Sequence, residues 1–553
     1  MTINEIQDYL KQHELNAYIV TRNNMFIGQD ILPEENKIKE LTGFSGSAGN
    51  LIIFQDRAVL LVDGRYDIQA CRQTDSSTVE VVCTRDSVSS WIHHNVHEPQ
   101  KFIYNAWCHS ISEVDYWRRS LNWHLFIEDR DNLLGSRVSP KQAEIFEMKE
   151  EFVGVSSEEK ISYLADFMAK NRLDAYLLCE SDSVSWLMNL RSDLIPYSCI
   201  LRAYALVHTG GEVSLYTSDF SKLVDELSLL QGKSIGINFS RTPKKVQDII
   251  KIAGAVYRGV NNPITDWKSI KNPVEISGFK ACHVRDGEAV CRFLSWLDKN
   301  YTDVDELGCV AKLHELRQQQ KDFYSESFAT IAGYGANGAI IHYQPTAETN
   351  QKLNAGSLLL LDSGAHYYDG TTDITRTIAL GKPTDAMIDD YTMVLKAHIA
   401  LSSQIFPIGT IGSQLDAITR SALWNKGKDY SHGTGHGVGY CLNVHEGPQS
   451  ISLKNPVPLQ SGMVCSIEPG YYLEGQYGVR IENLALIIEA QEGWLKFEPL
   501  TLVPYDHNLI NKSQLTETEI TWINNYHQQV GEKLLPLLDA ETAQWLKNQI
   551  RPL

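Results

Sequence analysis

Apolar and polar residues near the start of the chain are spaced in a way that predicts one helix followed by short strands. Residues 3–12 have apolar positions at helical spacing, which predicts a helix. Unbroken apolar stretches at residues 17–20, 51–54 and 58–62 predict strands. This order of elements favours an α/β domain at the beginning of the chain.

The same pattern begins again near residue 160. Residues 161–170 are helix-like, and residues 173–178 (LDAYLL) repeat residues 15–20 (LNAYIV) almost position for position. We therefore expect a duplicated α/β domain, against the alternative that an apolar strand recurs after a helix by chance.

The last half of the chain combines a long helical pattern at residues 275–298 with glycine-rich turns and apolar strands such as residues 357–361. Helix-like sequence returns at residues 517–535 and 540–547, and we expect this tail to pack as an extension or to form a subunit contact.

Two polar stretches divide these patterns. They lie at residues 148–160 and 261–273, and the second contains Pro263 and Pro273. We expect three domains, at residues 1–151, 152–268 and 269–553.

Composition narrows the class of protein. A chain of 553 residues is too long for one core, since cores stop growing beyond roughly 250 to 300 residues. With 43% apolar and 21% charged residues it is an ordinary globular protein, and its net charge of -18 disfavours a nucleic-acid partner. The cysteines form no Cys-x-x-Cys, which argues against a thiolate metal site and favours a reducing compartment. The charged N-terminus and the lack of an apolar run of about 18 to 20 residues predict a cytoplasmic protein without a membrane partner.

One candidate site begins with two aspartates. Asp362 ends an apolar strand of four leucines, and Asp373 follows eleven residues later. An ionised carboxylate in such apolar surroundings is costly unless something compensates it. A tight turn at Asp369 and Gly370 would leave Asp362 far from Asp373, so we expect the loop at residues 367–368, with the two aspartates opposite each other.

Two glutamates repeat the arrangement. Glu468 and Glu482 are fourteen residues apart, and Gly475 is their midpoint. A hairpin that turns at residues 474–476 would place the two glutamates face to face. Four clustered carboxylates would repel one another strongly, and divalent cations are the usual compensation.

The histidine-rich segment at residues 431–439 (SHGTGHGVG) adds imidazole ligands, and its glycines permit close backbone approach. One imidazole with four carboxylates suits manganese, cobalt, iron or zinc in a paired site better than magnesium or calcium. The alternatives are weaker for the whole set. A lone aspartate is usually a turn or cap residue, and a phosphate cradle would need the lysine and Ser/Thr of a P-loop.

These motifs, with His342 in residues 341–345 (IHYQP) and residues 444–448 (VHEGP), resemble the pita-bread metallopeptidases. Within them the chain resembles the Xaa-Pro aminopeptidases, also called aminopeptidase P, in their long three-domain form. The resemblance covers the whole chain. It implies two creatinase-like N-terminal α/β domains and a C-terminal pita-bread catalytic domain with two pseudo-symmetric halves.

The resemblance also assigns site residues. It implies two divalent metal ions per subunit, with manganese expected first and cobalt, zinc or iron as the other candidates. The implied metal ligands, of which Asp373 and Glu482 would bridge the ions, are Asp362, Asp373, His436, Glu468 and Glu482. By position in the family pattern, His342 and His445 would contact the substrate and the tetrahedral intermediate, and His432 and Tyr472 would line the proline pocket. On chemical grounds we expect Glu468 to accept the proton of the attacking water and pass it to the leaving proline nitrogen.

The expected reaction is hydrolysis of the N-terminal Xaa-Pro bond of short peptides by a hydroxide held between the two metals. The C-terminal tail resembles an extension that supports dimers, so we expect a homodimer, and a monomer mass at micromolar concentration would count against it.

Four alternatives compete with this interpretation. Prolidase shares the metal set but requires dipeptides, and methionine aminopeptidase normally lacks the two preceding domains. A non-enzymatic pita-bread peptide-binding protein or histone chaperone, like metal-free creatinase chemistry, would be expected to lack metal ligands, whereas all five positions are filled here.

Overall fold

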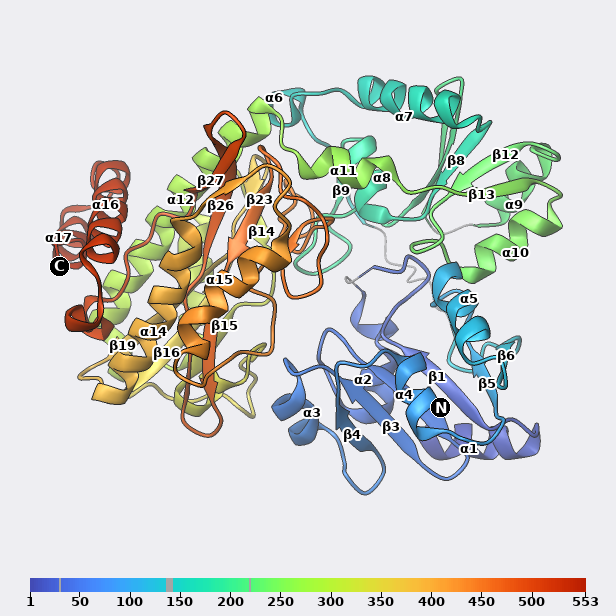
Figure 1. The fold of residues 1–553 in the computed structure, drawn as a ribbon, viewed down its shortest axis with the longest axis horizontal. Coiled ribbons are helices and arrows are strands. Elements are labelled where there is room, and N and C mark those ends of the chain that lie inside the picture. The colour runs from blue at the N-terminus through green and yellow to red at the C-terminus, as the bar shows by residue number, and fades with distance from the viewer. Residues whose placement is uncertain (29–30, 136–142, 218–219) are drawn as a thin grey trace. The chain divides into compact units, whose positions relative to one another are not determined.

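The chain is an α/β protein whose computed structural model describes residues 1–28, 31–135, 143–217 and 220–553 (Figure 1). It divides into two compact units. Unit 1 contains Met1–Glu147, Val155–Pro196 and Ile200–Ile264, and unit 2 contains Met148–Gly154, Tyr197–Cys199 and Thr265–Leu553. Among the described residues, no helix is both long enough and apolar enough to cross a membrane.

Unit 1 begins with a six-stranded sheet. Its strands, in spatial order, are β4 (Glu80–Cys83), β3 (Ala58–Val62), β2 (Asn50–Phe54), β1 (Ala17–Thr21), β5 (Lys101–Tyr104) and β6 (Leu125–Glu128). The helices of this part are α1 (Ile3–Gln12), α2 (Lys37–Thr42), α3 (Asp67–Gln73), α4 (Val88–Asn95) and α5 (Ile111–Ser120), with the 3₁₀ turn η1 (Pro33–Glu35). The helix and the three strands predicted here from apolar spacing are therefore confirmed.

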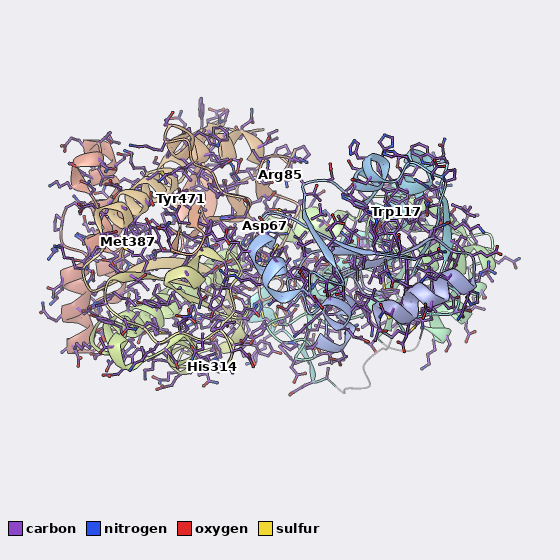
Figure 2. The ribbon with its side chains drawn as sticks, turned by 90° about the horizontal axis from the view of Figure 1, so that it is seen from below. Asp67, Arg85, Trp117, His314, Met387 and Tyr471 are labelled. Atoms are coloured by element: carbon purple, nitrogen blue, oxygen red, sulfur yellow. The ribbon has the colours of Figure 1, made fainter. Side chains whose placement is uncertain are left out.

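Both faces of this sheet are buried, which explains why its strands are unbroken apolar runs rather than alternating ones. Ile19 and Ile52 pack on one face with side chains of α4 and α5, whereas Tyr18 and Leu51 pack on the other face with α1. Trp117 of α5, labelled in Figure 2, packs edge-on against Tyr104 with 5.9 Å between ring centroids.

A second sheet in unit 1 repeats this topology. Its strands, in order, are β11 (Val213–Tyr216), β10 (Tyr204–His208), β8 (Ala175–Leu178), β12 (Ser234–Ile237) and β13 (Val256–Gly259). The helices that accompany it are α7 (Ser157–Asn171), α8 (Ser181–Leu187), α9 (Ser221–Leu229) and α10 (Lys244–Ile252), and β7 (Ile145–Glu147) pairs with β9 (Leu190–Ser192). Like β1, β8 follows a helix and pairs antiparallel with the next long strand and parallel with a later one. The expected duplication is confirmed.

Unit 2 opens with a long helix whose start is encoded locally. Asn272 caps α12 (Pro273–Asn300): its Oδ1 accepts from the backbone of Val274 (2.9 Å) and Glu275 (3.0 Å), while Glu275 accepts from the Asn272 N–H (2.9 Å). Proline at the first helical position fits this start. The remaining helices of unit 2 are α6 (Glu150–Val153), α13 (Glu306–Gln318), α14 (Asp385–Ser402), α15 (Gly412–Trp424), α16 (Glu517–Leu534) and α17 (Ala540–Gln549), and α11 (Pro263–Ser269) spans the boundary between the units.

The strands of unit 2 form small antiparallel sheets. One sheet contains β15 (Ile331–Tyr334), β16 (Ser357–Ser363) and β19 (Ile374–Leu380), and a second contains β14 (Phe323–Glu326), β17 (Ala365–Tyr367) and β18 (Gly370–Thr371). A third has the order β20 (Ile405–Pro407), β27 (Trp494–Pro499), β26 (Asn483–Gln491) and β23 (Val464–Ile467). Two-stranded pairs are β24 (Gly470–Leu473) with β25 (Tyr477–Arg480) and β21 (Gly435–His436) with β22 (Ser450–Ile451). The short 3₁₀ turns are η2 (Tyr301–Asp303), η3 (Gly335–Ala339), η4 (His507–Leu509) and η5 (Lys512–Gln514).

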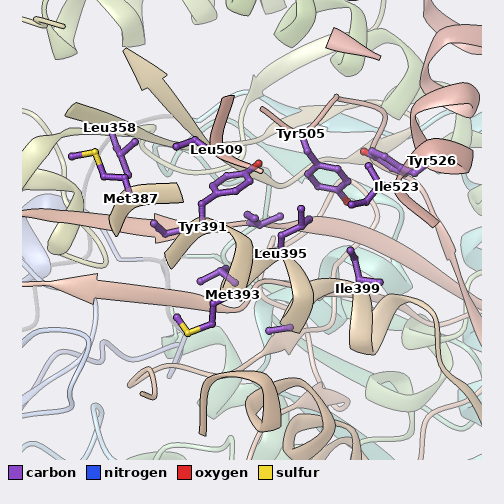
Figure 3. Packing of buried hydrophobic residues seen from close by; sticks show 14 of the residues in the cluster. Leu358, Met387, Tyr391, Met393, Leu395, Ile399, Tyr505, Leu509, Ile523 and Tyr526 are labelled. Atoms are coloured by element: carbon purple, nitrogen blue, oxygen red, sulfur yellow. The ribbon is translucent and has the colours of Figure 1, made fainter. Parts of the chain in front are cut away.

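The C-terminal tail contributes to the core of unit 2. Figure 3 shows side chains of α14, such as Tyr391 and Leu395, packed with Tyr505 and with Ile523 and Tyr526 from α16. All of these side chains are buried. The tail is thus a structural extension of unit 2, which was one of the two expectations from the sequence.

Candidate active site

The glutamate hairpin has the register that its midpoint predicted. Leu473 pairs with Tyr477 and Gly470 with Arg480 on one side, and Ile467 pairs with Asn483 on the other. Glu468 and Glu482 are therefore opposite each other, between the two paired segments. Gly475 makes the turn with a φ of +73°, which glycine adopts without the steric cost of a side chain.

The aspartate hairpin differs from the expected register by two residues. Asp362 pairs with Thr375, and Tyr367 pairs with Gly370, so the turn lies at residues 368–369. The prediction that Asp362 and Asp373 are directly opposite is wrong; Asp373 precedes Thr375 by two residues and is a diagonal neighbour. Because side chains alternate with a period of two, a two-residue shift keeps both carboxylates on the same face.

Packing explains why the Asp369-Gly370 pair does not form the turn by itself. A Cβ on Gly370 would lie 2.6 Å from the Cys282 sulfur of α12, so this glycine permits close contact with the helix. The Asp369 carboxylate forms an ion pair with Arg285 of the same helix. Tertiary contacts therefore displace the turn that the dipeptide suggests.

His436 brings the two hairpins together. One ligand atom from each of Asp373, His436 and Glu482 lies within 4.8 Å of the others. The His436 Nε2 is 3.4 Å from Asp373 Oδ2 and 3.6 Å from Glu468 Oε1. Its Nδ1 donates to the Gly437 carbonyl (2.9 Å), which leaves the Nε2 lone pair directed at the carboxylates.

Burial gives the carboxylates unusual proton affinities. Desolvation raises the pKa of Asp373 well above its usual range, and the neighbouring Asp362 and Glu468 raise it further. Desolvation likewise raises the pKa of Glu482 well above its usual range, with Asp373 as the next cause, and it raises the pKa of Glu468. The cluster therefore lacks sufficient positive charge from the protein itself.

Two buried oxygens test whether this donor set fits metal ions. Among the described residues, Asp362 Oδ1 and Glu482 Oε1 are buried and accept no hydrogen bond. Buried acceptors are normally satisfied, so two such atoms in one acidic cluster indicate ligands for a cation. The nitrogen and oxygen donors suit a pair of transition-metal ions.

Arg480 is a site residue that the sequence analysis missed. Its guanidinium is buried and donates to Asp362 Oδ2 (2.6 Å), to the Tyr472 hydroxyl (2.7 Å) and to Thr375 Oγ1 (3.1 Å). Thr375 in turn donates to Glu482 Oε2 (2.8 Å). The sequence did contain a signal for Arg480. This arginine stands between two apolar residues, two positions before Glu482, which is typical of a buried charge with a functional partner.

His432 and Tyr472, both assigned to substrate binding by resemblance, contact each other. His432 Nδ1 donates to the Gly433 carbonyl (2.7 Å), so its Nε2 can accept from the Tyr472 hydroxyl (2.8 Å). Desolvation raises the pKa of Tyr472 to about 12, which keeps this hydroxyl protonated at neutral pH. A directional chain thus runs from Arg480 through Tyr472 to His432.

The other two predicted histidines lie in loops. His445 is exposed, and its ring centroid lies 4.4 Å from that of His436. His342 is half-buried in the loop after η3, and η3 packs against β25 so closely that a Cβ on Gly478 would lie 1.8 Å from the Gly338 carbonyl oxygen. The substrate-binding roles of both histidines stay predictions.

Family comparisons agree with this architecture. Residues 277–489 match metallopeptidase family M24, and residues 493–553 match the C-terminal region of that family. Residues 3–124 and 136–233 each match a creatinase/prolidase N-terminal domain. The first of these matches contains β1–β5 of one sheet of unit 1, and the second contains β8, β10 and β11 of the other sheet.

Individual relatives cover the full chain. Xaa-Pro aminopeptidase 1 of Dictyostelium discoideum is 36% identical, over 100% of this chain and 96% of that protein. The X-prolyl aminopeptidase of Caenorhabditis elegans, described as a cytosolic enzyme with a di-nuclear active site, has a TM-score of 0.91 and 30% identity and covers 98% of this chain and 95% of its own. The prolidase of Pyrococcus horikoshii (TM-score 0.50, 26% identity) covers 99% of its own length but only 63% of this chain. The chain belongs to the Xaa-Pro aminopeptidases of metallopeptidase family M24.

Proposed function

We propose that this protein is a two-metal aminopeptidase that hydrolyses the bond between an N-terminal residue and a following proline. The observation that carries the proposal is the convergence of Asp373, His436 and Glu482 within 4.8 Å in an acidic cluster that Arg480 compensates only in part. Full-length similarity to Xaa-Pro aminopeptidases supports the specificity for proline at the second position.

Five side chains would hold two divalent metal ions, with Mn²⁺ as the proposed native ion: Asp362, Asp373, His436, Glu468 and Glu482. When bound, such ions lower the pKa of water by several units and polarise a peptide carbonyl. The orphaned oxygens of Asp362 and Glu482 support this assignment because they have no partner among the described residues.

The side chains around the cluster have distinct proposed roles. Glu468 accepts the proton of the attacking water and passes it to the nitrogen of the leaving proline. Its position 3.6 Å from His436 and its hydrogen bond from Ser466 Oγ (3.2 Å) support a fixed orientation. His342 and His445 contact the substrate and stabilise the tetrahedral intermediate, while His432 and Tyr472 line the proline pocket.

The proposed organisation comprises domains at residues 1–151, 152–268 and 269–553, supported by the two separate sheets of unit 1. We place the protein in the cytoplasm as a homodimer acting on short peptides. The cytosolic description of the C. elegans enzyme supports the location.

The decisive experiment compares two peptides on metal-stripped full-length protein before and after Mn²⁺ is added. Arg-Pro-Pro should release free arginine only with Mn²⁺, and the dipeptide Arg-Pro should stay intact. Cleavage of the dipeptide alone would indicate prolidase, and cleavage of neither peptide would favour a non-enzymatic peptide-binding protein.

Metal affinity should increase with pH. Asp373, Glu468 and Glu482 have raised pKa values in the metal-free protein, so the folded state keeps protons above the carboxylate pKa of about 4 found in unfolded chains. The free energy of unfolding of the metal-free protein therefore falls as pH rises from about 4 through the raised pKa values of these carboxyl groups. A metal ion that binds to them must displace their protons.

Calorimetric titration with Mn²⁺ at about pH 6 and about pH 8, in buffers of different ionisation enthalpy, measures both the affinity and the protons released. Glu482→Gln should release fewer protons than the wild type. An affinity that is the same at both pH values, with no proton release, would contradict the proposed ligand set.

A further inference from the structure

A buried ion cluster lies behind the loop that joins His436 to His445. The Lys268 ammonium is 2.8 Å from Glu446 Oε2, and the Lys271 ammonium donates to Glu446 Oε1 at 3.0 Å. The side chains of all three residues are only 1% exposed. We refer to Lys268, Lys271 and Glu446 as the lysine–glutamate cluster.

Such a cluster is a costly way to gain stability. Each buried charge loses its hydration, and the two ammonium groups both contact the same carboxylate. Apolar residues of the same size would often stabilise a core equally well. A buried ionic arrangement of this kind is better explained by the geometry that it imposes on its neighbours.

Those neighbours are strand β21, which carries His436, and the loop that carries His445. Glu446 directly follows His445, and its N–H donates to the Gly437 carbonyl (2.8 Å), next to His436. Its carboxylate lies under the same loop, because a Cβ on Gly439 would be 2.7 Å from Glu446 Oε2. His445 is exposed while Glu446 is buried, so the inward glutamate fixes the backbone from which the outward histidine projects.

The lysines come from a segment that is itself fixed at several points. The Lys271 ammonium donates to the Lys268 carbonyl (2.7 Å), and the Lys271 N–H donates to the Gly462 carbonyl (2.9 Å). Gly462 lies just before β23, the strand that leads to Glu468. Residue 272 then caps α12, so the start of the long helix holds the Lys271 backbone in place.

We propose that Glu446, held by Lys268 and Lys271, is a positioning residue that sets the placement of His445 and His436. The inference rests on the proposed function for the role of these histidines, whereas its effect on metal affinity can be measured independently of activity. It connects the segment before α12, which carries Lys268 and Lys271, with the loop that follows the proposed metal ligand His436.

The test uses the full-length protein and two variants. Glu446→Gln keeps the shape of the side chain but removes the negative charge that both buried ammonium groups contact. Lys268→Met instead leaves one lysine facing one carboxylate, a neutral pair that should fold even if Glu446→Gln does not. For each protein, kcat and KM are measured on Arg-Pro-Pro, and the Mn²⁺ dissociation constant is measured by calorimetry on metal-stripped material.

Glu446→Gln should lose about 10- to 100-fold in kcat or in Mn²⁺ affinity, as is typical when a group that orients a metal ligand is removed. Lys268→Met should lie between this variant and the wild type. A matched control is Glu35→Gln in unit 1, which breaks the buried Arg202–Glu35 pair (2.6 Å, side chains 5% and 9% exposed). It should lower the melting temperature and leave kcat and Mn²⁺ affinity unchanged.

A purely structural role predicts a different result. If Glu446→Gln and Lys268→Met only lower the melting temperature, with kcat and Mn²⁺ affinity of the folded proteins changed by less than about threefold, the positioning proposal is overturned. Failure of the wild type to cleave either peptide would instead count against the proposed function. In that case the Mn²⁺ affinities of wild type and variants still decide whether Glu446 positions His436.

Discussion

Glu468→Gln is expected to reduce kcat by about 10²- to 10⁴-fold, the range that a positioned proton-transferring side chain contributes. Glutamine has nearly the same shape and can still use its carbonyl oxygen as a weak metal ligand. It cannot accept a proton from water or deliver one to the proline nitrogen. Steady-state kinetics on Arg-Pro-Pro at saturating Mn²⁺ measures the loss.

Glu474→Gln provides the control for this substitution. Glu474 is exposed at the turn of the same hairpin, so its replacement changes the charge without touching the cluster. Its kcat should match that of the wild type. If Glu468→Gln retained kcat within about threefold of the wild type, another group would have to move the proton.

Arg480→Met should be the most destabilising single substitution in the site. The methionine side chain leaves the Asp362 carboxylate and the Tyr472 hydroxyl without the buried donors that now lie 2.6 and 2.7 Å away. Removing one partner of a buried ion pair costs about 3–5 kcal/mol in free energy of unfolding. Urea unfolding of metal-free protein measures this loss.

Two comparisons separate the causes. Tyr472→Phe removes only the hydroxyl and should cost about 2 kcal/mol, because its two hydrogen bonds, with Arg480 and His432, contribute about 1 kcal/mol each. Added Mn²⁺ should recover part of the stability of Arg480→Met, because a bound cation would compensate Asp362. Equal unfolding midpoints for Arg480→Met and wild type without metal would show that Arg480 does not neutralise the cluster.

Local sequence signals predicted the parts of the fold that local physics determines. The predicted start of α12 lies within a few residues of the observed one. The same holds for the apolar strands of the first sheet. The glutamate hairpin was also predicted correctly, because Gly475 at its midpoint is suited to the turn that the register requires.

Features that depend on distant contacts were harder to predict. The aspartate hairpin turns at residues 368–369 because Asp369 and Gly370 are engaged with α12, which no local pattern indicates. The lysine–glutamate cluster was missed for the same reason, and Arg480 was missed although its apolar neighbours in the sequence were a local signal. Arg480 is 118 residues from its partner Asp362 along the chain, and Lys271 is 175 residues from Glu446.

The position of α16 in the core implies an order of events during synthesis. Tyr526 of α16 accepts a hydrogen bond from Arg376 (3.1 Å), and Arg376 also donates to the backbone carbonyl of Glu482 (2.7 Å). Domains usually fold from the N-terminus onward as the chain leaves the ribosome. Unit 1 can therefore mature early, whereas the support behind Glu482 is complete only after α16 has emerged, so nascent catalytic units pass through a stage with an acidic cluster and an unfinished core.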